Sequence, residues 1–179
     1  MVVWVTGLSG SGKTSVCRLL FDALKPRMPE LVLLDGDALR ETLSTDLGFE
    51  EADRIRQIGR VQQLAKLLSE QDLVVLVAVV YARPDLLEWN RHHIQDYFEV
   101  LLDAPLNVVR ARDPKGLYAR ITRGETVNVV GVDLPWHQPK HPDIVLDPVR
   151  HRTPEDGAAA IARAVPRFAA HWSSRDVHA

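Results

Sequence analysis

The first residues whose types and spacing could do chemistry lie near the N-terminus. They are, in order, Gly7, Leu8, Ser9, Gly10, Ser11, Gly12, Lys13 and Thr14. This segment fills every fixed position of the phosphate-binding pattern G-x-x-x-x-G-K-[ST]. Glycines let successive backbone N–H groups curve around phosphate oxygens, while lysine adds a positive charge and the threonine hydroxyl can bind Mg²⁺. The segment therefore predicts a site for a nucleoside triphosphate, the alternative being a plain Gly/Ser turn.

The second group of chemical interest is a pair of carboxylates. Asp35, Gly36 and Asp37 follow the apolar run 31–34, so they would stand at the end of a strand. A carboxylate there could orient Mg²⁺ or accept a proton from a hydroxyl group. The alternative is an Asp-Gly turn that caps a helix. Arg40, one helical turn beyond Asp37, would point the same way unless it is an ordinary surface arginine.

The elements that must position these groups can be read from the apolar residues. Apolar runs predict strands at 2–5, 31–34, 73–80, 98–102 and 144–146. Helical spacing follows the phosphate loop as far as Pro26 and recurs at 53–68, while Pro84 and Thr153-Pro154 begin further helices. Alternating strands and helices predict an α/β fold, a doubly wound parallel sheet of about five strands with helices on both faces. Ligands then bind beyond the carboxyl ends of the strands, where the phosphate loop, Asp35, Asp37 and Tyr81 fall.

Residues 113–142 differ from the rest of the chain. They are rich in glycine, proline and charge and have weak periodicity, and they are long enough to form a functional lid. We refer to them as the lid segment. We expect a single domain over residues 1–172, in which Pro166 kinks or shortens the last helix, and a disordered tail over 173–179.

Composition limits the partners. The chain has 179 residues and a net charge of −2, which argues against a nucleic-acid-binding surface. It has no apolar run near the roughly 20 residues that span a membrane, and its first residues do not resemble a signal peptide. Its single cysteine, Cys17, cannot form an internal disulfide and is interpreted as a small core residue. A cytoplasmic protein that binds neither membrane nor nucleic acid is expected.

Taken together, the motifs resemble the adenylyl-sulfate kinase family over nearly the whole chain. Those enzymes transfer the γ-phosphoryl group of ATP to the 3′-hydroxyl group of adenylyl sulfate, in sulfate assimilation. The resemblance rests on the phosphate loop, on Asp35-Gly36-Asp37 with Arg40, and on the segments 46–49 (Asp-Leu-Gly-Phe), 53–54 (Asp-Arg), 112–118 (Arg-Asp-Pro-Lys-Gly-Leu-Tyr) and 131–136 (Gly-Val-Asp-Leu-Pro-Trp). It implies a P-loop kinase fold, ATP and Mg²⁺ as cofactors, and a homodimer.

The resemblance also implies roles for individual residues. Asp37 would be the base or the Mg²⁺ orienter, acting with Lys13 and Asp35, and Thr14 and Asp37 would be the metal ligands. The segment 112–118 would be part of the lid that closes over ATP, with Arg112 and Lys115 near the nucleotide. Arg40 and Arg54 would hold an anionic group of the acceptor, and Phe49 would stack on its base. Without the resemblance, Phe49 would be interpreted as a core aromatic.

Three departures from the family pattern fall on the acceptor side. Tyr81-Ala82-Arg83-Pro84 stands where the family has Ser-Pro-aromatic-Arg, so no phosphoserine is expected. Val129 replaces a lid phenylalanine, which would remove about 1 kcal/mol of stacking. Gln57-Ile58-Gly59 replaces Asn-Ile-Arg. Gln57, Tyr81, Val129 and Lys115 are therefore the residues expected to shape the acceptor pocket.

These departures leave more than one function open. The leading prediction is a kinase of adenylyl sulfate. One alternative is a kinase of another small nucleotide or metabolite, such as cytidine diphosphoramidate, whose smaller pyrimidine would tolerate the lost aromatic wall. The other is an ATP-binding regulatory protein that hydrolyses ATP slowly, because a phosphate loop serves both kinds of protein.

Overall fold

The computed structural model describes residues 1–148 and 150–173. These residues contain a five-stranded sheet in the order β2-β3-β1-β4-β5, and every neighbouring pair is parallel. The strands are β1 (Val2–Gly7), β2 (Leu31–Asp35), β3 (Val74–Val79), β4 (Tyr97–Leu102) and β5 (Ile144–Leu146). The prediction of a doubly wound parallel sheet is confirmed.

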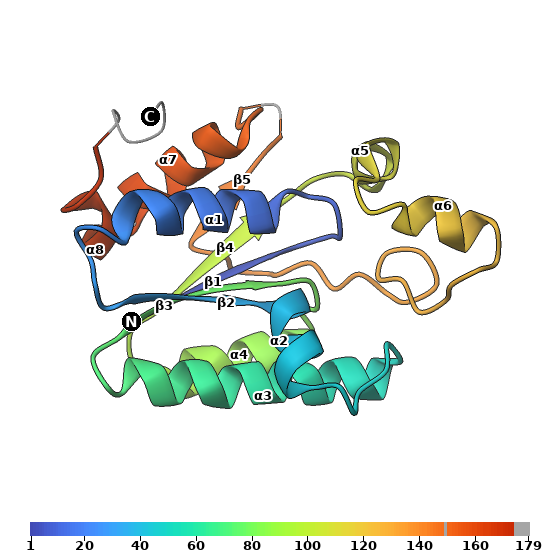
Figure 1. The fold of residues 1–179 in the computed structure, drawn as a ribbon, viewed down its shortest axis with the longest axis horizontal. Coiled ribbons are helices and arrows are strands. Elements are labelled where there is room, and N and C mark those ends of the chain that lie inside the picture. Colours follow the sequence, from blue (N-terminus) through green and yellow to red (C-terminus); the bar gives the residue numbers. More distant parts are fainter. Residues whose placement is uncertain (149, 174–179) are drawn as a thin grey trace.

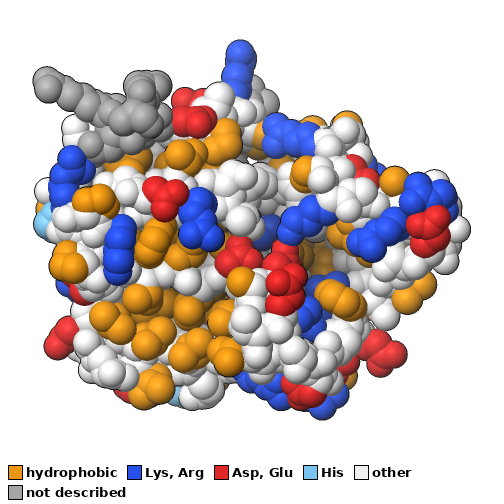
Figure 2. Space-filling model, in the orientation of Figure 1, with side chains coloured by type: hydrophobic (Ala, Val, Ile, Leu, Met, Phe, Trp, Pro, Cys, Tyr) orange, Lys and Arg blue, Asp and Glu red, His pale blue; other side chains and the backbone are white. Residues whose placement is uncertain are grey.

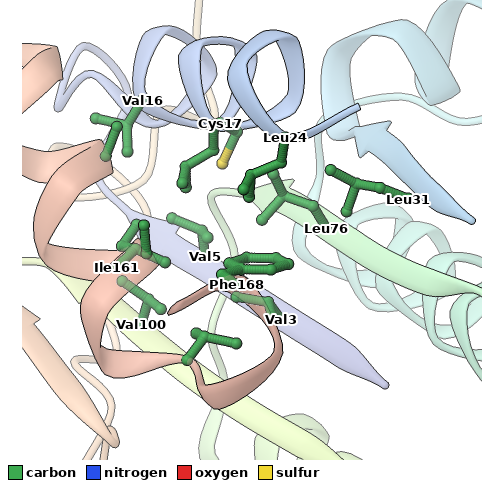
Figure 3. Packing of buried hydrophobic residues seen from close by; sticks show 14 of the residues in the cluster. Val3, Val5, Val16, Cys17, Leu24, Leu31, Leu76, Val100, Ile161 and Phe168 are labelled. Carbon is green, nitrogen blue, oxygen red and sulfur yellow. The ribbon is translucent and has the colours of Figure 1, made fainter. Parts of the chain in front are cut away.

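Helices cover both faces of the sheet (Figure 1). On one face lie α1 (Lys13–Leu24), α7 (Pro154–Ala164) and α8 (Pro166–Ala169), and on the other lie α3 (Glu51–Ser69) and α4 (Pro84–His93). Side chains of β1 alternate between the two layers: Val3 and Val5 pack with Phe168 of α8 (Figure 3), whereas Val2 and Trp4 pack with residues of α3. Burial on both faces explains why the strands are continuous apolar runs.

Capping residues set several helix boundaries as the sequence predicts. Thr153 and Asp156 form a reciprocal capping box at the start of α7, with Pro154 in the first turn. Pro166 ends that helix and begins α8, which confirms the predicted kink.

Cys17, a residue of α1, is buried in the hydrophobic core, as expected. No helix in residues 1–148 and 150–173 is long and apolar enough to cross a membrane.

The lid segment extends sideways from the sheet, after α5 (Leu106–Arg112) (Figure 1). It contains a short helix that the sequence analysis did not predict, α6 (Leu117–Thr122). The Asp113 carboxylate accepts hydrogen bonds from the backbone N–H groups of Tyr118, at 3.1 Å, and Ala119, at 2.8 Å. Local capping therefore stabilises a helix too short to show periodicity. Most of the predicted C-terminal tail, residues 174–179, lies outside the described residues.

Gly59 in the middle of α3 offers a test of helix propensity. A Cβ atom built there has no other atom within 4 Å, so alanine fits without a clash. We expect Gly59→Ala to raise the free energy of unfolding by about 1 kcal/mol, measured by urea denaturation. As a control, a Cβ at Gly36 would lie 3.1 Å from the carbonyl oxygen of Ala78, so Gly36→Ala should destabilise the fold. An unchanged or lower stability of Gly59→Ala would contradict the expectation.

Candidate functional site

The phosphate loop connects β1 to α1 at the carboxyl end of the sheet. Gly10 and Gly12 have φ angles of 77° and 98°, in the region that favours glycine. The N–H group of Ser11 closes the loop by donating to the carbonyl oxygen of Leu8 at 3.1 Å. The loop thus places backbone N–H groups and the N-terminus of α1 around one point, which is the arrangement that binds phosphate.

Lys13 lies within this loop and is buried. Its Nζ donates to the carbonyl oxygens of Gly7, at 2.9 Å, and Leu8, at 2.8 Å. Burial lowers the pKa of Lys13 to about 8, against the opposing effect of the nearby Asp37 carboxylate. A phosphate anion beside Nζ would stabilise the ammonium form and raise this pKa again.

This lowered pKa predicts a pH dependence of ATP binding. Above a pH of about 8 the free protein has largely lost the Lys13 proton, and bound phosphates restore it. Binding of ATP should therefore take up a proton, and its affinity should fall as the pH rises from about 7 to about 9.5. Isothermal titration calorimetry in buffers of different ionisation enthalpy measures that proton uptake, and Lys13→Met should abolish it. Binding at high pH without proton uptake would contradict the assignment.

The two carboxylates differ in their surroundings. Asp35 accepts from the Thr14 hydroxyl at 2.9 Å through Oδ2, and its Oδ1 caps α2 (Gly36–Leu43) by accepting from the N–H groups of Asp37 and Ala38. Asp37 instead pairs with Lys115 of the lid segment, and about two thirds of its side chain is exposed. The capping alternative thus holds for Asp35, which also orients Thr14. Asp37 is the carboxylate that neither Thr14 nor the helix cap engages.

Phe49 is not a core aromatic. It is 55% exposed, and the guanidinium groups of Arg40 and Arg54 lie 4.8 Å and 5.7 Å from its ring centroid. Burial lowers the pKa of both arginines. Arg40 also donates to the carbonyl oxygen of Gly48 at 2.5 Å, and the N–H of Gly48 donates to the Asp53 carboxylate at 2.7 Å. These bonds fix the loop that presents Phe49, so an exposed ring and two cations form one surface.

A cavity of about 190 Å³, which we name the loop cavity, joins these groups. Figure 2 shows acidic and basic side chains together around a hollow on this side of the molecule. Its lining includes Gly12, Lys13, Thr14, Asp35, Asp37, Arg40, Phe49, Arg54, Gln57, Tyr81 and Lys115. The structure thus brings most of the predicted site residues to one place.

Gln57 and Tyr81 behave differently within this cavity. Gln57 is only 4% exposed, yet neither its Nε2 nor its Oε1 has a hydrogen-bond partner among the described residues. Buried amides are seldom left unpaired, so this side chain is available to a ligand. The Tyr81 hydroxyl instead donates to Glu51 at 2.6 Å, and its pKa is raised to about 12, chiefly by burial. Tyr81 therefore forms a wall and has no free nucleophilic hydroxyl.

The lid segment encloses a second cavity of about 300 Å³, the lid cavity, lined by Phe49, Arg54, Lys115, Val129 and other residues. Arg54 donates from Nη2 to the carbonyl oxygen of Asn128 at 2.6 Å. Tyr118 donates to the carbonyl oxygen of Ser9 in the phosphate loop at 2.9 Å. The segment is thus bonded both to α3 and to the loop. Tyr118 was not singled out from the sequence, although it ends the 112–118 motif.

Arg112 lies apart from Lys115. It lines a third cavity of about 70 Å³, the rear cavity, together with Ser11, Gly12, Leu146 and His151. This cavity adjoins the phosphate loop and does not include Asp37. The two residues predicted to lie near the nucleotide therefore line different cavities, and His151 is a lining residue that the sequence analysis missed.

Comparisons with known proteins agree with this geometry. The family model described as Adenylylsulphate kinase matches residues 1–147. The adenylyl-sulfate kinase of Yersinia pestis is 44% identical over 152 residues, covering 82% of this chain and 70% of that protein. That of Marinobacter nauticus is 39% identical over 148 residues, covering 82% and 74%. The structure of the Mycobacterium tuberculosis APS kinase CysC in complex with AMPPNP and APS has a TM-score of 0.84 and 38% identity, over 91% of this chain and 95% of that one.

Proposed function

The chain belongs to the adenylyl-sulfate kinase family, and we propose that it transfers the γ-phosphoryl group of ATP to the 3′-hydroxyl group of adenylyl sulfate. The observation that carries this proposal is one cavity that joins Lys13 of the phosphate loop to Asp37, to the arginine pair and to Phe49. A donor of phosphoryl groups and an anionic, aromatic acceptor can meet there. Phosphoryl transfer requires alignment and charge neutralisation more than covalent chemistry.

On the donor side, the loop N–H groups and Lys13 bind the phosphates. Thr14, with the carboxylates of Asp35 and Asp37, offers the oxygen ligands that Mg²⁺ prefers. When bound, Mg²⁺ neutralises charge on the β- and γ-phosphates. Asp35 holds the Thr14 hydroxyl in place through their hydrogen bond. The nucleoside of ATP would lie against the rear cavity, which opens beside Ser11 and Gly12 and, at about 70 Å³, does not by itself enclose a nucleoside.

On the acceptor side, Arg40 and Arg54 would bind the phosphate and sulfate of adenylyl sulfate, and Phe49 would stack on its base. Gln57 can pair with a base edge through its free amide. Asp37 would accept the proton of the 3′-hydroxyl as its oxygen bonds to the γ-phosphorus. The bond between the γ-phosphorus and the bridging oxygen then breaks, and ADP leaves.

The proposal extends to the lid segment, the oligomeric state and the location of the protein. We infer that the lid segment closes over the nucleotides, which the bonds of Tyr118 to Ser9 and of Arg54 to Asn128 support. We also infer that the protein is a homodimer, as in the family it resembles, that each subunit is a single domain over residues 1–172, and that it is cytoplasmic. Light scattering of the purified protein measures the oligomeric state, and a monomer would overturn the dimer.

The direct test follows radiolabel from the γ-position of ATP in the presence of Mg²⁺ and adenylyl sulfate. We expect one equivalent of 3′-phosphoadenylyl sulfate for each ADP formed. The 3′-deoxy analogue of adenylyl sulfate is the control, because it lacks the accepting hydroxyl, and it should gain no label. Formation of ADP at the same rate with either compound or with none would overturn the proposal in favour of a regulatory NTPase.

A further inference from the structure

A buried carboxylate lies away from the loop cavity, in the middle of β4. Glu99 is only 2% exposed and lies beside the buried Trp4 in the sheet register. The Tyr97 hydroxyl donates to Oε2 of Glu99 at 3.1 Å, and Nη2 of Arg91, in α4, lies 3.4 Å from the same atom. Burial raises the pKa of Glu99, against the effect of Arg91. Burying a charged carboxylate costs free energy, so the interactions that hold Glu99 in place call for a structural explanation.

The partners connect Glu99 to the end of the lid segment. The N–H of Glu99 donates to Oδ2 of Asp143 at 2.7 Å, and the N–H of Asp143 donates to the carbonyl oxygen of Glu99 at 2.8 Å. Arg91 reaches the same Asp143 oxygen at 3.3 Å and donates to the carbonyl oxygen of His141 at 2.5 Å. One guanidinium and two reciprocal hydrogen bonds therefore fasten residues 141–143 to α4 and β4.

These residues immediately precede β5, which has only three residues. A strand this short has few ladder hydrogen bonds with which to fix its register, and a slip of one residue would reverse its side chains. In the observed register Val100 pairs with Ile144 and Leu102 with Leu146. Leu146 then lines the rear cavity beside Ser11 and Arg112. The register of β5 thus shapes the wall of that cavity.

We propose that Glu99, Arg91 and Asp143 are positioning residues for the donor nucleotide. Their cluster fixes the end of the lid segment and the register of β5, and so holds the wall of the rear cavity in place. The inference rests on the proposed function only in taking that cavity as the site of the ATP nucleoside. None of the three residues lines the loop, lid or rear cavity, so they act through β5.

The test measures binding of a non-hydrolysable ATP analogue with Mg²⁺ by isothermal titration calorimetry, which needs no acceptor. We expect Asp143→Ala to weaken binding about tenfold, because the wall residues move. Asp143→Asn keeps an oxygen for the N–H of Glu99, so binding should stay within about twofold of the parent protein. Val2→Ala is the matched control. It removes buried packing at the start of β1, the end remote from the phosphate loop, so it should lower Tm without weakening binding.

Arg91→Lys provides a second variant should Asp143→Ala fail to fold. It keeps the charge but lacks the fork that joins Glu99, Asp143 and His141, so we expect binding to weaken about threefold. Binding by Asp143→Ala or Arg91→Lys equal to that of Val2→Ala at the same loss of Tm would overturn the proposal. So would equal weakening by Asp143→Asn and Asp143→Ala. Because only ATP analogue is added, an error about the acceptor leaves this result unchanged.

Discussion

Asp37→Asn is expected to lower kcat for phosphoryl transfer by about 10³-fold, because the amide cannot accept the proton of the acceptor hydroxyl. Asp35 and Asp37 both line the loop cavity, but Asp35 is engaged by Thr14 and by the cap of α2, so Asp37 is the carboxylate assigned as the base. The substitution preserves size and shape. Single-turnover kinetics with saturating ATP and acceptor measure the chemical step directly.

Glu41→Gln provides the matched control for this variant. It neutralises a carboxylate one turn further along the same helix, at an exposed position that lines none of the three cavities. We expect its kcat to match that of the parent protein. A kcat for Asp37→Asn that also matches the parent would show that Asp37 is not the base, while leaving the phosphate loop assignment intact.

Arg54→Gln is expected to raise KM for the acceptor by about 50-fold, with a much smaller change in KM for ATP. Arg54 lines both the loop cavity and the lid cavity and flanks the ring of Phe49. It also donates to the carbonyl oxygen of Asn128, so the change loosens the lid segment as well. Both effects weaken acceptor binding. Initial-rate kinetics with each substrate varied in turn measure the two KM values.

Arg56→Gln is the control for Arg54→Gln, because it makes the same substitution on α3 at a residue that does not line the loop or lid cavity. Arg56 lies on the same helix, its side chain is 65% exposed, and it pairs with Asp53 at the surface. Since exposed ion pairs contribute little, its KM values should remain near those of the parent protein. An Arg54→Gln enzyme whose acceptor KM equals that of Arg56→Gln would exclude Arg54 from the acceptor site.

The sequence predicted most of the sheet and the place of the phosphate loop between β1 and α1 because those features are local. Continuous apolar runs marked the strands, and the pattern from Gly7 to Thr14 marked the loop. Thr153, Pro154 and Asp156 marked the start of α7 for the same reason, since a cap depends on neighbouring residues. In contrast, α6 has six residues, too few for a periodic pattern, and its stabilising cap comes from Asp113.

Features that depend on distant residues could not be predicted in this way. The bond between Thr14 and Asp35 joins two elements, and it decides which of the two carboxylates is already engaged by a side chain of the phosphate loop. The bond between Tyr81 and Glu51 likewise joins residues 30 positions apart, and it engages the Tyr81 hydroxyl so that this side chain only lines the cavity. Arg112 and Lys115 are close in sequence, yet they line different cavities. Glu99 did leave a signal, because it is a lone carboxylate within the apolar run 98–102.

The lining of the lid cavity bears most directly on which acceptor the enzyme uses. Val129 is 3% exposed and lines that cavity where the family has an aromatic, so Phe49 is the one aromatic ring in its described lining. Loss of one stacking wall weakens binding of any base by about 1 kcal/mol and does not exclude adenine. The paired arginines and the free amide of Gln57 remain.

The acceptor can be identified by comparing kcat/KM for adenylyl sulfate, cytidine diphosphoramidate and plain nucleosides, at saturating ATP and Mg²⁺. We predict the highest value for adenylyl sulfate, and very low values for nucleosides because they lack the anion that Arg40 and Arg54 would bind. Negligible turnover of adenylyl sulfate beside rapid turnover of cytidine diphosphoramidate would contradict the account.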